Sequence, residues 1–317
     1  MSHILVTGAN GFVGRALAAR LLAAGNHALT LIDQSFDGAQ PLPGVRCLCG
    51  SFGDSTLLDD ALRTPVDIVF HLASVPGAVA ERDTLLGRAI NLDATLLLAH
   101  RLAGQCARTA CPPRVVFASS VAVYGAFDGP MNEDCLPQPA ISYGAHKWVA
   151  EILLADLSRR GELDAVSVRL PGIVARPAAE SGHGSAFMSR IMHAVAAGEY
   201  YDCPVSADAT CWWMSLSCCI DNLLHAAAMP VTGRAWQLPV LHLTVRQVID
   251  ALSRHVNRNG HALVAWAPDA RIEALFGRCP PLDTPAALAA GFRHDGDAGR
   301  LVAAALALSD PGLPTLR

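Results

Sequence analysis

The chain has 317 residues, of which 52% are hydrophobic and only 16% charged, so a large buried core is expected and wholesale disorder is not. A net charge of -4 gives no reason to expect nucleic acid or an anionic membrane as a partner. The ten cysteines include no C-x-x-C pair, so we expect free thiols in a reducing compartment and no metal site.

The N-terminus, "MSHILVTGANG", enters an apolar run directly and has no basic region followed by a cleavage site. No apolar run approaches the ~18 residues that a membrane span needs. We therefore expect a cytoplasmic protein without a membrane-spanning segment.

The first half of the chain alternates short apolar runs with amphipathic stretches. The runs have the length of buried strands, and the stretches have helical periodicity. This alternation predicts an α/β fold with a doubly wound parallel sheet, the Rossmann arrangement. We expect strands over residues 3–8, 27–33, 66–74, 113–120 and 164–174, and helices over 14–25, 89–107 and 148–160.

The pattern loosens after about residue 170. Glycine, proline and serine cluster there, and later helices are expected over residues 186–198 and 244–256. We expect residues 1–170 to form the Rossmann domain, to which residues 216–240 return. Residues 171–317 are expected to form mainly a smaller, interleaved C-terminal lobe that binds the substrate.

A glycine-rich segment, "TGANGFVG", places Gly8, Gly11 and Gly14 between the first strand and the first helix. Glycines at this point allow a tight turn and let backbone N–H groups approach a pyrophosphate at a helix N-terminus. A plain strand-to-helix turn is the alternative. The position directly after the first strand favours dinucleotide binding.

Asp33 ends the second expected strand, about twenty residues beyond the glycines. A carboxylate there can accept both hydroxyls of the adenosine ribose and would repel a 2′-phosphate, and no Arg or Lys follows in "QSFDGAQ". A solvated aspartate at a strand end is the alternative. We interpret Asp33 as selecting NAD over NADP.

The segment "YGAHK" places Tyr143 and Lys147 on one face of a helix. The phenol of tyrosine ionises near pH ~10, and a neighbouring ammonium lowers that value, so Tyr143 is a candidate general acid/base. Ser119 and Ser120 end a strand, where the ligand crevice of a parallel sheet lies. Chance occurrence of a Tyr and a Lys at this spacing is the alternative.

In their order and content, "TGANGFVG", "HLAS", "SSVAVYG" and "YGAHK" resemble the extended short-chain dehydrogenase/reductases over the first ~240 residues. The resemblance implies NAD as cofactor, Ser120, Tyr143 and Lys147 as catalytic residues, and Asn91 near the active site. Ser51 replaces an acid that the family uses near adenine. The cofactor contacts implied are Gly8, Asn10, Gly11, Phe12, Val13, Asp33, Ser51, Phe52, Leu72, Ala73, Ser74, Asn91, Ser119, Tyr143, Lys147, Pro171 and Ile173.

Most extended members act on nucleotide sugars, but two of their motifs are missing here. Gly172 stands in "RLPGIVARP" where they have an Asn, and "CWWMSL" stands where they have an Arg for the diphosphate. The segments "FHLASVPG", "FASSVAVYG" and "FMSRIMHAVAAG" instead resemble D-erythronate dehydrogenases, which oxidise the C2 hydroxyl of a small sugar acid.

A carboxylate of that kind would have to be received in the cleft. The candidate substrate contacts are Ser74, Ser120, Tyr143, Arg176, His183 and Ser185. The alternatives are that Arg176 is a surface residue and that His183 is an ordinary loop residue.

Two other functions remain open: a nucleotide-sugar epimerase or dehydratase that retains NAD, and a non-catalytic NAD-sensing regulator. The intact Ser120, Tyr143 and Lys147 argue against the regulator. The resemblance also implies a homodimer, in which residues 89–100 and 143–155 of each subunit form a four-helix bundle.

Overall fold

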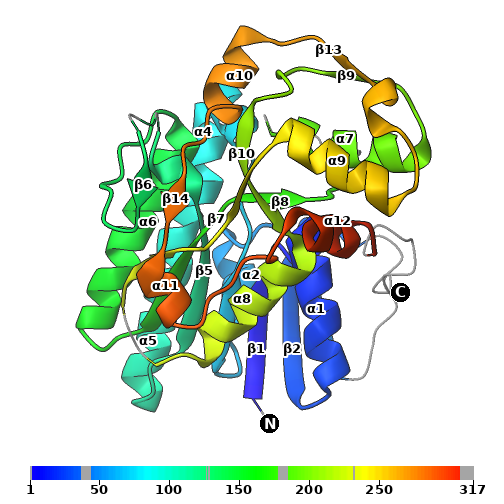
Figure 1. Cartoon of the computed structure of the whole chain (residues 1–317). Helices are drawn as coiled ribbons and strands as arrows, with labels where there is room; N and C mark the ends of the chain where they lie inside the picture. The colour runs from blue at the N-terminus through cyan, green and yellow to red at the C-terminus, as the bar shows by residue number, and fades with distance from the viewer. Residues whose placement is uncertain are drawn as a thin grey trace.

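The computed structural model describes residues 2–36, 44–125, 127, 129–177, 185–230 and 233–307 (Figure 1). Its centre is a seven-stranded parallel sheet with the strand order β11-β7-β5-β4-β1-β2-β3. The strands are β1 Ser2–Thr7, β2 His27–Asp33, β3 Val45–Cys49, β4 Ile68–His71, β5 Arg114–Ser120, β7 Asp164–Leu170 and β11 Ala235–Gln237. The predicted doubly wound α/β fold is therefore confirmed, and the strand order reverses between β1 and β4, where a ligand crevice is expected.

Helices cover both faces of this sheet. On one face α1 (Phe12–Ala24) and α8 (Leu216–Ala228) pack against residues such as Val6. On the other face α2 (Ser55–Ala61), α5 (Ala94–Thr109) and α6 (Ser142–Arg159) pack against residues such as Leu5. Successive strand residues thus enter opposite cores, which explains why these strands are apolar without interruption.

A smaller lobe lies beyond the carboxyl ends of the main strands, at the upper right in Figure 1. It contains a three-stranded sheet, a two-stranded sheet and three longer helices around a core that includes Trp213. These elements are β8 Gly172–Val174, β10 Thr210–Ser215, β12 Leu241–Thr244, β9 Tyr201–Cys203, β13 Val264–Trp266, α7 Phe187–Ala197, α9 Val245–His255 and α12 Ala298–Ala307.

Short elements complete the described chain. They are α3 Gly77–Arg82, α4 Thr84–Arg88, η1 Ala89–Asp93, η2 Val121–Val123, β6 Met131–Asn132, η4 Gly260–Leu263, α10 Ala270–Phe276, β14 Leu282–Asp283 and α11 Pro285–Ala289. The helix expected over residues 89–107 is divided, because residues 89–93 form a π-helical turn before α5 begins. The helix expected over residues 148–160 begins earlier, at Ser142.

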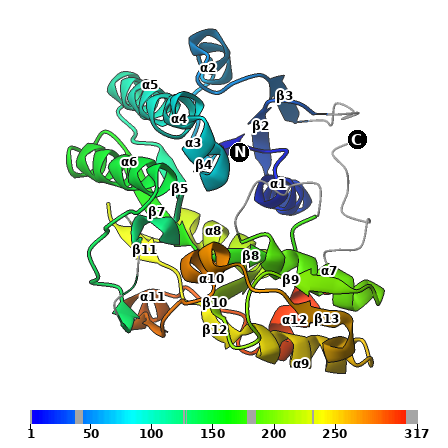
Figure 2. The same cartoon turned by 90° about the horizontal axis from the view of Figure 1, so that it is seen from above.

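The two lobes exchange segments. After β8 and β10 in the smaller lobe, the chain returns through α8 to β11, which pairs with β7 at the edge of the main sheet. It then re-enters the smaller lobe at β12. Figure 2 shows the lobes side by side, with α10 near the boundary between them. We propose residue 170 as the boundary of the first domain.

A buried ion pair joins α6 to β7. Glu151 and Arg169 are 5% and 8% exposed, and their side chains form two charge-assisted contacts, Nη2–Oε2 at 2.7 Å and Nε–Oε1 at 3.0 Å. The hydroxyl of Ser119 also donates to Glu151, and Arg169 donates to the Tyr124 hydroxyl at 2.8 Å. Each charge is therefore paired and hydrogen-bonded to further polar groups, which the burial of ions requires.

Within the described residues, the helices are all too short or too polar to cross a lipid bilayer.

The ion pair gives a prediction about stability. Replacing Glu151 by Ala leaves the Arg169 guanidinium buried without a carboxylate, which should cost about 3–5 kcal/mol of unfolding free energy. The control is Asp156→Ala on the same helix, whose ion pair with Arg159 is exposed and should contribute only about 0–1 kcal/mol. Urea unfolding compares the two. Equal losses would contradict the assignment of Glu151 to the core.

Candidate active site

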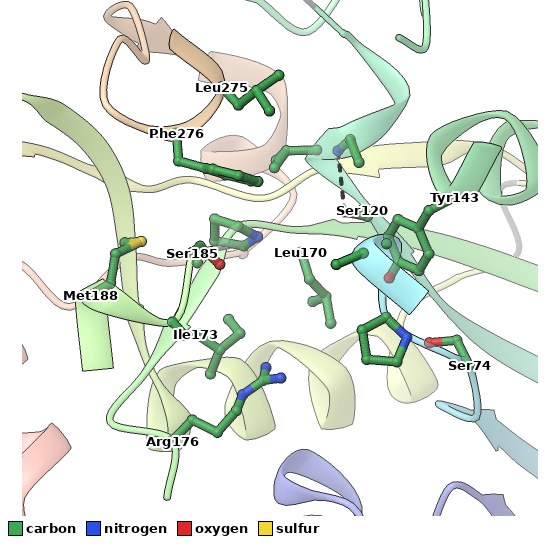
Figure 3. Close-up of a pocket in the computed structure, with 18 of the residues that line it drawn as sticks. Ser74, Ser120, Tyr143, Leu170, Ile173, Arg176, Ser185, Met188, Leu275 and Phe276 are labelled. Carbon is green, nitrogen blue, oxygen red and sulfur yellow. Dashed lines mark hydrogen bonds between the residues drawn. The ribbon is translucent and has the colours of Figure 1, made fainter. Parts of the chain in front are cut away.

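A cavity of about 970 Å³ lies between the two lobes, at the carboxyl ends of the main strands (Figure 3). The cavity wall includes fourteen of the residues that were expected to contact the cofactor or the substrate. They are Gly8, Gly11, Phe12, Val13, Leu72, Ser74, Ser119, Ser120, Tyr143, Lys147, Pro171, Ile173, Arg176 and Ser185. Asn10, Asp33, Ser51, Phe52, Ala73 and Asn91 are absent from its lining, and His183 lies outside the described residues.

The glycine-rich turn has almost no room for side chains. Gly8 has a φ of 71°, and a Cβ there would lie 2.7 Å from the Ala73 backbone nitrogen. A Cβ on Gly14 would lie 2.0 Å from the Gly8 carbonyl oxygen. Helix α1 begins immediately after this turn, at Phe12. Its N-cap residue is Gly11, which has no side chain to accept a hydrogen bond from the first N–H groups of the helix. The first N–H groups of α1 therefore suit a phosphate.

Asp33 connects this turn to the end of β2. Its carboxylate accepts hydrogen bonds from the backbone N–H groups of Asn10 at 2.8 Å and Gln34 at 2.7 Å. The Asn10 side chain donates to the Ser35 carbonyl at 2.9 Å. Each carboxylate oxygen has a further lone pair, so Asp33 is oriented and still able to accept from hydroxyl groups.

The next two predicted contacts lie close by, after β3. The Ser51 hydroxyl accepts from the Gly53 N–H at 3.1 Å. The Phe52 side chain is buried in the core, with its ring 5.0 Å from the ring of His71. A ligand at this position can therefore meet only the main chain of Phe52.

Three hydroxyl groups meet in the cavity. Ser120 ends β5, and its Oγ accepts from the Ala122 N–H at 3.1 Å. Tyr143, in the first turn of α6, lines the same cavity, with Ser74 and Ser120 near its side chain (Figure 3). Burial raises the pKa of Tyr143, whereas the Ser74 hydroxyl, the charge of Arg176 and the Ser120 hydroxyl act to lower it.

Lys147 lies one turn along α6 and is only 2% exposed. Its Nζ donates to the Ala118 carbonyl at 2.8 Å, and lies 4.7 Å from the centroid of the Phe117 ring and 5.6 Å from that of Tyr143. Burial lowers the pKa of Lys147 to about 7, against the opposing effect of Glu151. The charge of Arg176 acts to lower the pKa of Tyr143, and the same effect of Lys147, which the sequence led us to expect, stays a prediction.

Two predicted side chains are engaged elsewhere. The Asn91 amide accepts from the Val75 N–H at 2.8 Å and donates to the Val75 carbonyl at 3.1 Å. The Ser119 hydroxyl donates to Glu151. These two side chains form hydrogen bonds within the protein. A direct contact of either one with a cofactor remains a prediction.

Arg176 reaches the cavity from the segment that follows β8. Its N–H donates to the Ser189 hydroxyl at 3.0 Å, and its carbonyl accepts from His193 Nε2 at 2.9 Å, so α7 fixes its backbone. The side chain points into the cavity, with its guanidinium 5.5 Å from the centroid of the Phe12 ring (Figure 3). The structure therefore places Arg176 in the cavity wall.

The sequence did not identify several residues of the wall. They come from α3, α7, β10 and α10, and they are Arg82, Met188, Arg190, Trp212, Arg271, Leu275 and Phe276. Met188 is both buried and part of the wall. Met188, Arg190 and Trp212 lie in the segments "FMSRIMHAVAAG" and "CWWMSL" but had no assigned contact, and no motif marks the other four residues.

Residues 4–214 match the model of the family described as "NAD dependent epimerase/dehydratase family". A protein named D-erythronate dehydrogenase from Cupriavidus necator is 34% identical over 98% of this chain and 99% of its own length. A protein of the same name from Haemophilus influenzae is 32% identical over 93% of this chain and 95% of its own length.

The fold also matches a solved structure. The nucleoside-diphosphate-sugar epimerase from Agrobacterium tumefaciens superimposes with a TM-score of 0.88 at 28% identity, covering 100% of this chain and 96% of that one.

The buried Lys147 predicts a pH-dependent effect on stability. Its pKa is lower in the folded chain than its ordinary value, so between about pH 7 and 10.5 the unfolded chain binds more protons. The contribution of Lys147 to stability therefore improves as pH rises through this window. Lys147→Met should gain most relative to wild type near pH ~6, and the gain should shrink toward pH ~10. Thermal unfolding of both proteins at the two pH values measures this. A difference that does not change with pH would contradict the shifted pKa.

Proposed function

Since the chain belongs to the NAD-dependent epimerase/dehydratase family, we propose that it oxidises the C2 hydroxyl of a small sugar acid, with D-erythronate as the first candidate. The chain is an NAD-dependent oxidoreductase. The acid, the carbon that reacts and the roles of the individual residues form the proposal. It is supported by two near-full-length relatives named for this activity and by the position of Arg176.

The glycine-rich turn fits a bound NAD. Space that a Cβ would fill at Gly8 and Gly14 lets the backbone approach a pyrophosphate at the N-terminus of α1. In the proposal, Asp33 accepts hydrogen bonds from the hydroxyls of the adenosine ribose, and Lys147 donates a hydrogen bond to the nicotinamide ribose. When bound, NAD supplies the hydride acceptor.

Tyr143, Ser120 and Ser74 provide the acid/base chemistry in this proposal. The Tyr143 phenolate accepts the proton of the C2 hydroxyl, while Ser120 hydrogen-bonds to the same oxygen and holds it in place. The hydride leaves C2 as its C–O bond becomes a carbonyl, which gives a 2-keto acid and NADH. Because burial raises the pKa of Tyr143, its neighbouring donors and cations must stabilise the phenolate.

The observation that carries the choice of a 2-hydroxy acid is the position of Arg176. Its charge acts on Tyr143, and both side chains line the same cavity. In a 2-hydroxy acid the carboxylate carbon is bonded directly to the reacting carbon. A cation that binds the carboxylate must therefore face the same cavity as the hydroxyls, as Arg176 does. Arginine can bind a carboxylate through two parallel hydrogen bonds.

Packing around Gly172 favours a small substrate. A Cβ at Gly172 would lie 2.6 Å from Met188 Cε and 3.0 Å from the Trp212 carbonyl oxygen. Met188 thus fills the space that an Asn side chain would need. The Trp212 indole is fixed by its hydrogen bond to the Pro280 carbonyl at 2.7 Å. The wall here is apolar, and an Asn in place of Gly172 would have to displace the Met188 side chain.

An epimerase that retains NAD is the competing function. Three further arginines in the cavity wall, Arg82, Arg190 and Arg271, favour it because they could bind a diphosphate. The two functions differ in their products, since only the dehydrogenase releases NADH.

We also propose that the chain forms a homodimer through α6 and its neighbours. Val149 and Ile152 on α6 are 44% and 56% exposed, and Leu85 on the adjacent α4 is 81% exposed. Leu98 on α5 is buried in the core and is not available for this surface.

The reaction is tested by NADH release. Wild-type protein should form NADH from D-erythronate and should not convert UDP-sugars. Tyr143→Phe should lower kcat by ~10²–10⁴-fold because it removes the proton acceptor. Arg176→Ala should raise KM for D-erythronate far more than KM for erythritol, a neutral polyol of the same length. UDP-sugar conversion without net NADH, and no turnover of D-erythronate, would support the epimerase instead.

Asp33 gives a prediction about cofactor choice. Its carboxylate should favour NAD, because a 2′-phosphate would meet a fixed negative charge. Asp33→Ala should weaken NAD binding and reduce the preference over NADP. Dissociation constants for both cofactors, measured by protein fluorescence, provide the test. Tighter binding of NADP by the wild type would rule out this role for Asp33.

A further inference from the structure

The loop between β4 and α3 carries Ser74, which lines the cavity near Tyr143 and whose hydroxyl acts to lower the pKa of that phenol. The residues on either side of Ser74 are tied to the protein by side chains rather than by strand pairing. Ala73 is bound on one side and Val75 on the other. The position of the Ser74 hydroxyl therefore depends on these two attachments.

The attachment at Val75 is the amide of Asn91. Asn91 is 1% exposed and lies in the π-helical turn η1. Its Oδ1 accepts from the Val75 N–H at 2.8 Å, and its Nδ2 donates to the Val75 carbonyl at 3.1 Å. Both functional groups of the amide are thus used on one residue of the loop.

The attachment at Ala73 is a buried chain of hydrogen bonds. The Ala73 N–H donates to Thr7 Oγ1 at 3.3 Å, and this hydroxyl lies 2.6 Å from His71 Nδ1. His71 Nε2 lies 2.9 Å from the Thr95 hydroxyl, which donates to the Asn91 carbonyl at 3.1 Å. Both attachments therefore end at Asn91.

The direction of each bond in this chain can be assigned. Because the Thr95 hydroxyl donates to Asn91, its oxygen accepts from the His71 Nε2–H. The other ring nitrogen, Nδ1, then accepts from the Thr7 hydroxyl. This arrangement needs a neutral imidazole, and burial lowers the pKa of His71 to about 3, with the charge of Lys147 acting in the same direction.

We propose that Asn91, with the Thr95–His71–Thr7 chain, forms a clamp that positions Ser74 against Tyr143. Asn91 and His71 are then positioning residues that act through Ser74, and neither has to touch the cofactor or the substrate. Only the kinetic test of this inference rests on the proposed dehydrogenase reaction. A second test needs no turnover.

The chain contains a matched control for this clamp. Gln105, on α5, is 3% exposed and binds Val66, just before β4, in the same manner. Its Oε1 accepts from the Val66 N–H at 3.0 Å, and its Nε2 donates to the Val66 carbonyl at 2.8 Å. Gln105 does not line the cavity. Loss of the Asn91 amide and loss of the Gln105 amide should therefore destabilise the fold to a similar extent. Only the loss of the Asn91 amide should disturb the site.

The first experiment is hydrogen exchange of the backbone amides, followed by mass spectrometry of a peptide that spans residues 72–76. Asn91→Leu and Thr95→Val should each accelerate exchange in this peptide about tenfold or more, because a buried partner of the loop is lost. Gln105→Met should leave its exchange unchanged and lower the thermal midpoint by a similar amount. Equal acceleration in all three variants, or in none, would overturn the clamp.

The second experiment is a double-mutant cycle with Ser74→Ala. Ser74→Ala and Asn91→Leu should each lower kcat/KM for D-erythronate by about tenfold to a hundredfold, and the double variant should be no worse than either one. NAD affinity should change less than about twofold in Asn91→Leu. Independent, multiplying losses, or a loss confined to NAD affinity, would overturn the proposal and favour direct contact. If wild type oxidises no sugar acid, the proposed function fails and hydrogen exchange alone decides the clamp.

Discussion

The rest of this site depends on one buried ammonium group, that of Lys147. Lys147 has lost almost all contact with water, and its Nζ donates a hydrogen bond to the Ala118 carbonyl. A charge in that position is tolerated only if fixed groups replace the lost water. Glu151, one turn further along α6, is the carboxylate that acts on Lys147, and Arg169 and Ser119 hold Glu151 in turn.

This network connects catalytic and structural requirements in the same elements. α6 carries both Tyr143 and Lys147 toward the cavity, and Glu151 toward β7. β5 ends in Ser119 and Ser120, one facing the buried carboxylate and the other facing the cavity. Alternation along a strand sends adjacent side chains to opposite sides. The position of Ser120 is therefore coupled to that of the buried ion pair.

The smaller lobe contributes a further cation to the cavity. Arg176 follows β8 and is tied by its backbone to α7, so its guanidinium enters the cavity from the side opposite Ser74. A ligand between the lobes can thus meet hydroxyls on one side and a cation on the other. Gly172 and Met188 make part of the cavity wall apolar.

Sequence reasoning reached the fold and the residues of the cavity because both depend on local patterns. Apolar runs predicted strands, and the spacing of "YGAHK" placed Tyr143 and Lys147 on one helical face. The strands β3 and β11 were not predicted, since each is short and lies at an edge of the sheet.

The direction in which a side chain points could not be read from the sequence. Asn91 was assigned to the cofactor, yet its amide binds Val75. Phe52 was also assigned there, and its ring lies in the core. The pairing of Glu151 with Arg169 was missed, because a helix and a strand bring the two together. The available signal for this pair was that each of the two charged residues stands in an otherwise apolar segment.

The central claim is that hydride leaves C2 of a small sugar acid whose carboxylate lies beside Arg176. Mass spectrometry of the NADH formed from D-erythronate deuterated at C2 tests it most directly. The account predicts that the deuterium appears in the nicotinamide ring of NADH and that the product is a 2-keto acid. NADH without deuterium, formed while the label stays on the product, would place the oxidation at another carbon and contradict the account.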